Sequence, residues 1–283
     1  MGLDRLDQPE PGLDHPMATT TPAPGRLTML GRQVDYWLTV YRRTWRGSVF
    51  TSFVMPLFYV FAMGVLLGGF IDDGSADLQG APSYLAFIAP GLVAAHAMTI
   101  ATGEVMWPVY GAVKWNKTYL GMAATPLSVS DIVTAHFAFV LFRVATACGV
   151  FMLVLSLFDV FDSVGGAMLA FLVQLLLGMA FATPLYGLSA GLKSQTAFPV
   201  IYRVGLVPLF LFSGAFFPIT NLPPAMQWLA VATPLWHGVD LTRMLTLGDV
   251  DASAALVHVA YLTVMLAVGW WWAVRRLTTT LVH

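Results

Sequence analysis

Six apolar stretches, each long enough to cross a lipid bilayer, constrain this chain more than any other feature of its sequence. A transmembrane helix needs about 20 consecutive, mostly apolar residues. Hydrophobic residues make up 58% of the 283 residues and charged residues only 10%, so polar side chains are too few to cover a water-soluble protein. The sequence therefore predicts an all-α polytopic membrane protein with six transmembrane helices. The apolar runs are residues 48–70, 83–107, 131–158, 165–191, 198–218 and 253–274.

The residues that precede the first apolar run divide into two parts. Residues 1–25 combine prolines with Asp, Thr and Gly, a composition that predicts a disordered cytoplasmic tail. Residues 26–47 carry apolar side chains at three- and four-residue steps with arginines between them, which is typical of an amphipathic helix at the membrane interface. An ordinary basic flank of the first span is the alternative interpretation. The transmembrane domain then covers residues 48–283.

The charges between the apolar runs indicate how the helices are oriented. If residue 26 lies in the cytoplasm and six spans follow, basic residues collect on the inner side and aspartates on the outer side, with Arg243 as the exception. This satisfies the positive-inside rule and puts both termini in the cytoplasm of a plasma membrane that we expect to be bacterial. The inner basic residues are Arg26, Arg32, Arg42, Arg43, Arg46, Lys114, Lys117, Lys193, Arg275 and Arg276; the outer acidic residues are Asp72, Asp73, Asp77, Asp159, Asp162, Asp249 and Asp251.

Residues 211–245 form an apolar stretch that prolines interrupt. Because prolines remove helical hydrogen bonds, and freed backbone groups at membrane depth must be shielded, the stretch predicts two short half-helices in a re-entrant hairpin between the fifth and sixth spans. His237, Asp240 and Arg243 follow at three-residue steps and would share one helical face. We interpret them as a gate or structural clasp at the outer end. The prolines are Pro218, Pro223, Pro224 and Pro234.

The longest cytoplasmic connection, residues 108–130, mixes lysines with aromatic and aliphatic residues. Apolar anchors on a short helix with polar flanks suit binding in a groove of another protein. We therefore expect a docking helix, the alternative being a solvated loop with incidental aromatics. Its candidate contact residues are Lys114, Trp115, Lys117, Tyr119, Leu120 and Met122.

Two segments taken together resemble a known family. The segments are KTYLGMAATPLSVSDIV at residues 117–133 and FLFSGAFFPITNLPPAMQWLAVATPLWHGVDLTRML at residues 210–245. With the six-helix layout around them, they resemble the type 2 ABC exporter permeases, particularly the nodulation-protein J and daunorubicin-resistance membrane subunits. The resemblance implies that residues 26–47 are an interfacial connecting helix and that residues 108–127 hold a coupling helix seated on a separate ATPase subunit.

The same resemblance implies the function and the partners. The chain would be half of a membrane domain, pairing with a second copy of itself and with two ATPase copies that hold ATP and Mg. It would export an amphipathic, lipid-linked or glycan-linked substrate or a drug by alternating access. The chain carries no GxxxxGK[ST] motif, so we expect it to bind no cofactor and to be no enzyme itself.

Ionisable residues inside spans are costly and are therefore candidates for function. Glu104, Arg143 and Arg203 are the main ones. For Arg143 we favour an interhelical ion pair or snorkelling over contact with the substrate. An acidic residue commonly precedes the coupling helix in the family that the chain resembles, so Glu104 would hold that helix through a lysine or a backbone donor. His96, His136 and His258 are weaker candidates, for which hydrogen bonds within the bundle are favoured because none has a second ligand at metal spacing.

Two further patterns concern helix surfaces. Phe212, Phe216 and Phe217 could line a dimer seam or an apolar translocation path, although packing or lipid contact explains them equally. Two Gly-x-x-x-Gly steps begin at Gly64 and Gly187 and allow close approach of helices.

Other classes of function fit less well. A secondary transporter driven by an ion gradient is the main alternative, but its halves often repeat and no repeat is evident here. A membrane-embedded enzyme is less favoured, because the spans carry no HExxH motif, paired aspartates or nucleophile elbow. The net charge of −1 indicates no nucleic-acid partner. Cys148 is the single cysteine and has no partner for a disulfide or metal site.

Overall fold

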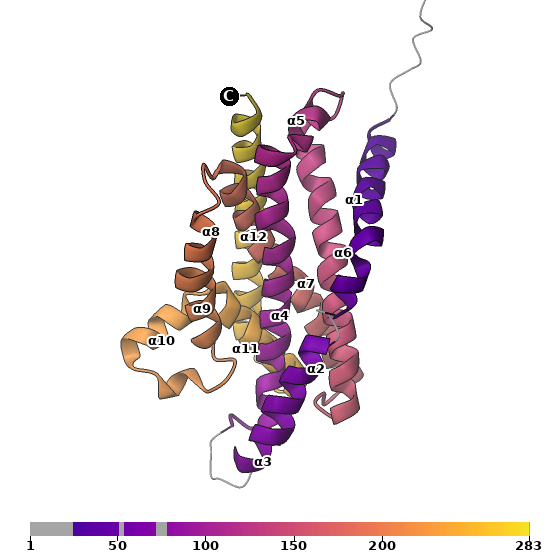
Figure 1. Ribbon diagram of the computed structural model, residues 1–283. Coiled ribbons are helices and arrows are strands. Elements are labelled where there is room, and N and C mark those ends of the chain that lie inside the picture. Colours follow the sequence, from indigo (N-terminus) through magenta and orange to yellow (C-terminus); the bar gives the residue numbers. More distant parts are fainter. Residues whose placement is uncertain (1–24, 51–53, 72–77, 283) are drawn as a thin grey trace, which may run out of the picture.

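The computed structural model describes residues 25–50, 54–71 and 78–282, and within these residues the secondary structure is helical, without strands (Figure 1). The predicted tail, apart from Gly25, lies outside the described residues. So do Asp72, Asp73 and Asp77 of the first predicted outer loop.

Four helices in the described part of the chain are long and apolar enough to cross a membrane. They are α4 (Tyr84–Tyr110), which continues as the π-helix η3 (Gly111–Trp115), α6 (Val129–Leu155), α7 (Val164–Gly191) and α12 (Ala252–Val282). They run side by side in a bundle (Figure 1). Apolar helices of sufficient length are thus confirmed for the runs at 83–107, 131–158, 165–191 and 253–274.

Each of these four helices begins at a side chain that caps its free backbone N–H groups. Ser83, Ser128 and Ser163 accept hydrogen bonds from the backbone of the first turns of α4, α6 and α7. Asp251 Oδ1 accepts from the backbone N–H of Ser253 at 2.8 Å, just inside α12. Short polar caps of this kind stabilise helix starts by about 1 kcal/mol each, so the polar residues between the apolar runs fix where the helices begin.

The first and fifth predicted spans are less regular than expected in the part of the chain that the structure describes. Part of the first lies outside the described residues, and the rest forms α2 (Met55–Tyr59), the π-helix η2 (Val60–Leu67) and α3 (Gly68–Ile71). The fifth comprises α8 (Ala197–Val200), η5 (Ile201–Leu206) and α9 (Val207–Leu211). This helical run is about 22 Å long at 1.5 Å per residue, less than the hydrocarbon core of about 30 Å.

The predicted end of the fifth span at residue 218 is wrong, because the helix stops at Leu211. The chain turns immediately afterwards, and Gly214 takes a φ of +77°, which residues with a Cβ rarely adopt. The apolar residues 212–218 therefore belong to a turn, which their hydrophobicity alone does not reveal.

The predicted amphipathic helix is present as α1 (Arg26–Val49). It runs alongside α6 in the described structure (Figure 1). Trp37 is buried and stacks on Phe139 of α6, with ring centroids 5.4 Å apart, whereas Arg42, Arg43 and Arg46 are exposed. The helix thus has the two faces expected from its sequence, and its placement at a membrane interface stays a prediction.

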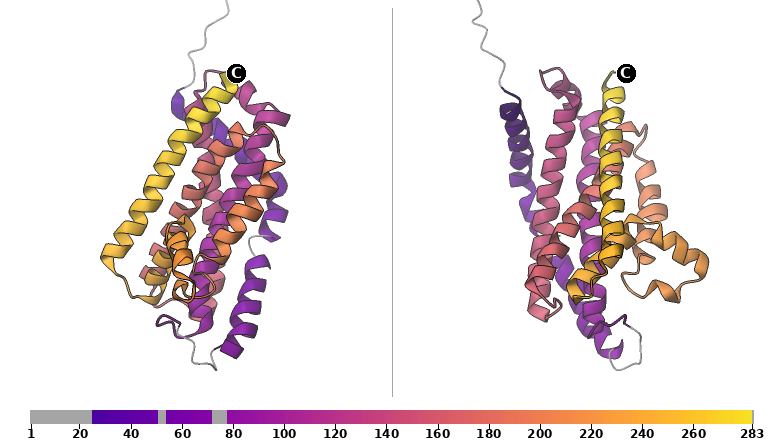
Figure 2. Two further views of the ribbon diagram at one scale, coloured as in Figure 1. Left: turned by 90° about the vertical axis from the view of Figure 1, so that its left-hand side faces the viewer. Right: turned by 180° about the vertical axis from the view of Figure 1, so that it is seen from behind.

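The proline-rich stretch forms the two short helices that the sequence predicts. A 3₁₀ turn (η6, Ile219–Asn221) leads into α10 (Pro224–Val231) and α11 (Pro234–Leu247). Pro224 and Pro234 occupy the first helical positions, where a missing N–H costs nothing, and Thr233 caps α11. Seen from behind, α10 projects beside the bundle (Figure 2). The prolines therefore start these helices as well as separating them.

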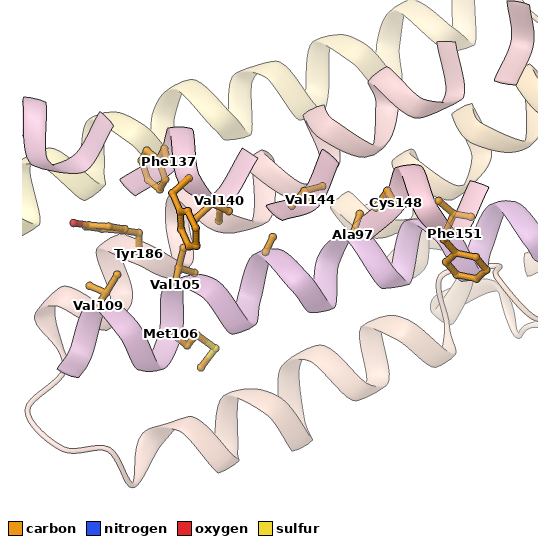
Figure 3. Packing of buried hydrophobic residues seen from close by; sticks show 14 of the residues in the cluster. Ala97, Val105, Met106, Val109, Phe137, Val140, Val144, Cys148, Phe151 and Tyr186 are labelled. Atoms are coloured by element: carbon orange, nitrogen blue, oxygen red, sulfur yellow. The ribbon is translucent and has the colours of Figure 1, made fainter. Parts of the chain in front are cut away.

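The core of the bundle lies between α4, α6 and α7. Figure 3 shows Val105 of α4 on the side that faces Val140 and Val144 of α6, Met106 on the opposite side of α4, and Tyr186 of α7 at one end. Cys148 is buried in the same layer. In a bilayer such packing relies on close van der Waals fit, since lipid tails are as apolar as the side chains.

Glycines provide the closest helix approaches. A Cβ added to Gly187 would lie 3.0 Å from the Trp272 ring, and one added to Gly191 would collide with Arg276, so both glycines of this step face α12. A Cβ on Gly64 would lie 2.5 Å from Leu85 of α4. In the described structure, Gly64, Gly187 and Gly191 thus serve packing within one chain.

Candidate functional site

A chain of hydrogen bonds joins the segment between α4 and α6 to the bundle core. The short helix α5 (Thr118–Ala123) carries Tyr119, whose hydroxyl lies 2.6 Å from Nδ1 of His136 on α6. Nε2 of His136 lies 3.0 Å from the carbonyl oxygen of Glu104 on α4. A carbonyl can only accept, so Nε2 carries the proton, and in the neutral ring Nδ1 accepts from Tyr119.

Burial maintains this arrangement. Tyr119 is 1% exposed, and burial raises the pKa of its hydroxyl well above the ordinary value, so the hydroxyl stays protonated and able to donate. His136 is also fully buried. The bond from α5 to α6 is therefore shielded from water, which makes it costly to leave unmade.

Glu104 and Arg143 form an ion pair beside these residues. Nε of Arg143 lies 2.7 Å from Oε1 of Glu104, and the two side chains are 5% and 23% exposed. Within the described residues the ion pair of Glu104 is thus with α6 and involves neither Lys114 nor Lys117. The predicted hold of Glu104 on the docking segment through a lysine or a backbone donor is thus not among these contacts; its backbone carbonyl instead accepts from His136, which also bonds to Tyr119 of α5. We call Tyr119, His136, Glu104 and Arg143 the inner polar cluster.

The amphipathic helix α1 contacts the same cluster. The Trp37 ring stacks on His136 with centroids 4.1 Å apart and planes 25° apart. One turn later, the Tyr41 ring faces the Arg143 guanidinium, with Cζ 4.8 Å from the centroid, a favourable cation–π distance. Both aromatics belong to the three- and four-residue pattern of apolar side chains in residues 26–47, a pattern that does not connect them with Arg143 or His136.

The predicted docking residues differ in exposure. Lys114 and Lys117 are exposed, Trp115 and Leu120 are 54% and 51% exposed, and Met122 is half-buried. Tyr119 is the exception, since it points into the bundle. Tyr119 therefore anchors α5 to the bundle, a correction to its expected place among the outward contacts, while Leu120 and Trp115 remain available to a partner.

Arg243 of α11 holds the turn after α9. Its Nη2 donates to the carbonyl oxygens of Gly214 at 2.7 Å and Phe87 at 3.3 Å, and its Cζ lies 4.3 Å from the centroid of the Phe87 ring. Nη1 reaches Oε1 of Gln79 at 3.4 Å. One buried guanidinium thus joins α11, α4 and the turn, and we call these contacts the Arg243 clasp. The role of gate or structural clasp for His237, Asp240 and Arg243 together stays a prediction.

His237 and Asp240 contact His258 of α12, whereas Arg243 bonds to α4 and the turn. The predicted set of His237, Asp240 and Arg243 therefore does not form one hydrogen-bonded cluster. Nδ1 of His237 lies 2.7 Å from Nδ1 of His258 on α12, and Nε2 of His258 lies 3.2 Å from Oδ2 of Asp240. Successive positions at three-residue steps drift around a helix of 3.6 residues per turn. That drift turns Arg243 toward α4, whereas His237 and Asp240 meet α12.

The remaining candidates are the phenylalanines of the turn after α9 and Arg203. Phe212, Phe216 and Phe217 are half-buried in the turn after α9, where Phe216 packs edge-to-face on Phe210, with centroids 4.8 Å apart. Arg203 is exposed on η5. Among the described residues no group of three or more His, Cys, Asp or Glu side chains is arranged to hold a metal ion.

The amino-acid sequence that forms these contacts is similar to that of known proteins. Residues 34–247 match the family model described as ABC-2 type transporter, a range that covers the second part of α1, the inner polar cluster and the α10–α11 pair. The chain belongs to the ABC-2 type transporter family. This membership makes it a membrane permease subunit of an ABC transporter and implies association with a separate ABC ATPase subunit.

Individual relatives of this permease agree over most of its length. Nodulation protein J of Rhizobium leguminosarum bv. viciae is 30% identical over 239 residues, which cover 82% of this chain and 90% of the relative. Nodulation protein J of Rhizobium meliloti (strain 1021) is 29% identical, covering 79% and 84%. The inner membrane transport permease YadH of Escherichia coli (strain K12) is 26% identical, covering 75% and 80%.

Proposed function

We propose that this permease is the membrane half of an ATP-driven exporter, in which two copies of the chain pair with two copies of an ATPase subunit. The partner would supply ATP hydrolysis, with ATP and Mg held on that subunit. The cargo would be an amphipathic, lipid-linked or glycan-linked molecule or a drug, moved out of the cytoplasm or the inner leaflet of a bacterial plasma membrane.

The proposed topology has six spans and both termini in the cytoplasm. Two observations support it. Lys114, Lys117 and Lys193 follow α4 or α7 at the end of the bundle where α12 ends (Figure 1). Arg275 and Arg276 lie in the last turns of α12. The aspartates at 159, 162, 249 and 251 lie in the connections at the opposite end. A basic end facing the cytoplasm follows the positive-inside rule.

The observation that carries the proposal is the buried attachment of α5 to the inner polar cluster. A docking element transmits force only if it is fixed to the elements that must move. Tyr119 ties α5 to His136, and His136 in turn bonds to the backbone of α4 at Glu104. Displacement of α5 by a partner would therefore move α4 and α6 together, while Leu120 and Trp115 present apolar surface to that partner.

Transport would then follow an alternating-access cycle. ATP binding would close the two ATPase subunits, α5 of each permease would move with them, and the path between the permeases would open outward. The cargo would be released because its affinity differs between the two states, as any ligand-driven cycle requires.

Co-purification with the ATPase tests the proposal. The tagged permease is extracted in mild detergent, and its stoichiometric partners are identified by mass spectrometry. We expect a polypeptide with a phosphate-binding loop, which is lost from Leu120→Asp because the charge disrupts an apolar docking contact. Val250→Asp is the matched control, since Val250 is also exposed but lies in the connection at the other end of the bundle.

The alternatives give different results in the same preparation. If the pure chain transports its cargo in vesicles under an ion gradient alone, the protein is a secondary transporter and not an ATP-driven exporter. If Leu120→Asp and Val250→Asp retain the ATPase equally, α5 is not its docking element.

A further inference from the structure

Four aromatic rings form a cluster between the docking segment (residues 108–130) and the fifth helical run. Two of them, Trp107 and Tyr110, belong to the last turn of α4. The third is Trp115 at the end of η3, and the fourth is Phe198 in α8. We call these four residues the aromatic cluster. It shares no residue with the inner polar cluster.

Trp115 is partly exposed and partly packed in the aromatic cluster. Its side chain is 54% exposed. Its ring stacks on Trp107 with centroids 6.0 Å apart and meets the Tyr110 ring edge-on at 5.4 Å. A Cβ added to Gly111 would lie 3.1 Å from Cε3 of the same ring, so the ring also lies against the backbone of η3. A partner that presses on the exposed part of Trp115 therefore displaces a ring that is seated on α4.

Phe198 connects the aromatic cluster with the fifth helical run. Its ring lies 4.6 Å from Trp107 and 5.5 Å from Tyr110, centroid to centroid. Among residues Ala197–Leu211, all of which the structure describes, Phe198 and Leu206 are the buried ones. Aromatic pairs at such distances stabilise packing beyond the area that they bury. The start of the fifth helical run is therefore held by Trp107 and Tyr110.

The fifth helical run is held at both ends and is exposed along one face between them. Just beyond its far end, in the turn after α9, Nη2 of Arg243 donates to the carbonyl oxygen of Gly214 at 2.7 Å. Between the two ends, Val200, Val204 and Val207 are exposed, so the described part of the chain leaves this face uncovered. A helix held in this way tilts when its first turn is displaced, as in the small shifts of packed helices that accompany conformational changes.

We propose that the aromatic cluster carries movement of the docking segment to the fifth helical run, with Trp107 as the ring between Trp115 and Phe198. Packed side chains have low compressibility, so a displacement of Trp115 reaches Phe198 and tilts the run. Tyr119 acts on α4 and α6 instead, and one docking segment thus moves two parts of the permease. The inference deepens the proposed function and rests on it for the ATPase that drives the movement. Trp107 and Phe198 are then positioning residues, which act through the fifth helical run and not by contact with the cargo.

A distance between two spin labels tests this role. The labels are attached at Val204→Cys on η5 and Leu172→Cys on α7, both exposed positions, in a Cys148→Ala background and in one permease chain of each permease–ATPase complex in lipid nanodiscs. Double electron–electron resonance measures the distance with and without a non-hydrolysable ATP analogue, which we expect to shift it in wild-type complexes. In Phe198→Leu and in Trp107→Leu, the ratio of shifted to unshifted complexes should fall at least about twofold, the lower end of what mutations along coupling networks cause. The yield of the ATPase should stay unchanged.

Two control variants separate transmission from packing. Phe210→Leu removes a ring of the same helical run that contacts Phe216 and lies outside the aromatic cluster, so the shift should remain. Trp107→Phe keeps a ring beside Phe198 and should retain most of the shift. The unfolding temperature is measured for every variant, because a purely structural role lowers that temperature without changing the response to the nucleotide analogue. Trp107 is 41% exposed, so Trp107→Leu keeps the test available if the buried substitution Phe198→Leu lowers the yield of folded complex.

Three results would overturn the inference. The first is a wild-type complex whose label distance does not respond to the nucleotide analogue, and the second is a response that is unchanged in Phe198→Leu and Trp107→Leu. The third is a response that Phe210→Leu reduces as much as these two variants do. Failure of the proposed function is a separate result, since it appears as absence of the ATPase from the purified wild-type permease.

Discussion

Nε of Arg143 and Oε1 of Glu104 lie 2.7 Å apart and join α6 to α4 beside the point where α5 is attached. The Arg143 side chain is almost fully buried, so the carboxylate is the group that compensates its charge. Removing one member of such a pair is far more costly than removing both, because a lone buried charge has no solvent to stabilise it.

The ion pair predicts how variants of Glu104 behave. Glu104→Gln keeps an oxygen for Arg143 but loses the charge, so we expect a folded permease whose ATP-driven transport falls by at least about fivefold, the lower end of usual coupling energies. Glu104→Leu should lower the free energy of unfolding by about 3 kcal/mol. Thermal unfolding in nanodiscs and transport in vesicles measure the two effects.

The double variant Glu104→Leu/Arg143→Leu is the control for this prediction. It should recover most of the stability lost in Glu104→Leu, since no charge is left buried. If the double variant is as unstable as the sum of the two single variants, the pair does not act as a unit. Export unchanged in Glu104→Gln would remove its role in coupling.

Tyr119→Phe should weaken the attachment of α5. The substitution keeps the ring packing and removes the hydroxyl that donates to His136, leaving a buried acceptor unpaired at a cost of about 1–3 kcal/mol. We expect a lower unfolding temperature and less ATP hydrolysed in response to cargo. Tyr36→Phe is the matched control, because Tyr36 is an exposed tyrosine of α1 and should change neither quantity. Equal behaviour of the two variants would contradict the role of Tyr119.

Arg243→Lys should loosen the turn after α9. Lysine keeps the charge but lacks the planar group that stacks on Phe87 and donates to two carbonyl oxygens. Ser213 is buried in this turn, so its exposure reports the change. In a Cys148→Ala background, Ser213→Cys should react with a membrane-impermeant maleimide several-fold faster when Arg243→Lys is added, a loss of about 1 kcal/mol or more in local stability.

The control for the clasp is Arg203→Lys, since Arg203 is exposed on η5. It should leave the labelling rate of the cysteine at position 213 unchanged. A rate that rises equally with both lysine variants would indicate a general loosening of the bundle, and an unchanged rate in Arg243→Lys would dismiss the clasp.

Gly91→Ala should displace the same turn from α4. A Cβ at Gly91 would lie 2.5 Å from Cα and Cβ of Ala215, closer than real Cβ atoms approach, so backbone must move. We expect a loss of about 1–3 kcal/mol in the free energy of unfolding, typical of overpacking. Gly103→Ala, in the same helix with open space around it, should be neutral or stabilising by up to about 1 kcal/mol. Comparable unfolding temperatures for the two variants would refute the close contact.

Several local features of this permease were predictable because they depend on neighbouring residues. The four long helices follow from apolar runs flanked by Ser or Asp caps, and the α10–α11 pair follows from prolines that fit the first turn of a helix. The end of the fifth helical run was not predictable in this way. Residues 212–218 are as apolar as the helix before them, and the turn forms because Gly214 takes a positive φ and Arg243, which lies outside the run, donates to its carbonyl oxygen.

The candidate site residues show the same division. Glu104, Arg143 and Tyr119 were identified from their chemistry, but their partners were not, since Glu104 and Arg143 are 39 positions apart and Tyr119 bonds to a histidine on another helix. Packing around the Glu104–Arg143 pair also decides which residues contact the inner polar cluster. Trp37 stacks on His136, and the Tyr41 ring faces Arg143. His96 was a weaker candidate for function in the sequence, because whether its ring nitrogen is paired depends on its surroundings and not on the residue itself.

The sequence by itself determined that this chain is a helical membrane protein of the ABC-2 transporter family, because hydrophobicity, prolines and local motifs act over a few residues. Tertiary structure alone decided that Tyr119 faces inward while Leu120 faces outward. It also decided that Arg243 bonds to α4, whereas His237 and Asp240 contact α12, and that His96 borders a cavity. Those outcomes depend on which helix faces lie together, and lipid-like apolar side chains on every side of a span leave that choice to close packing and buried hydrogen bonds.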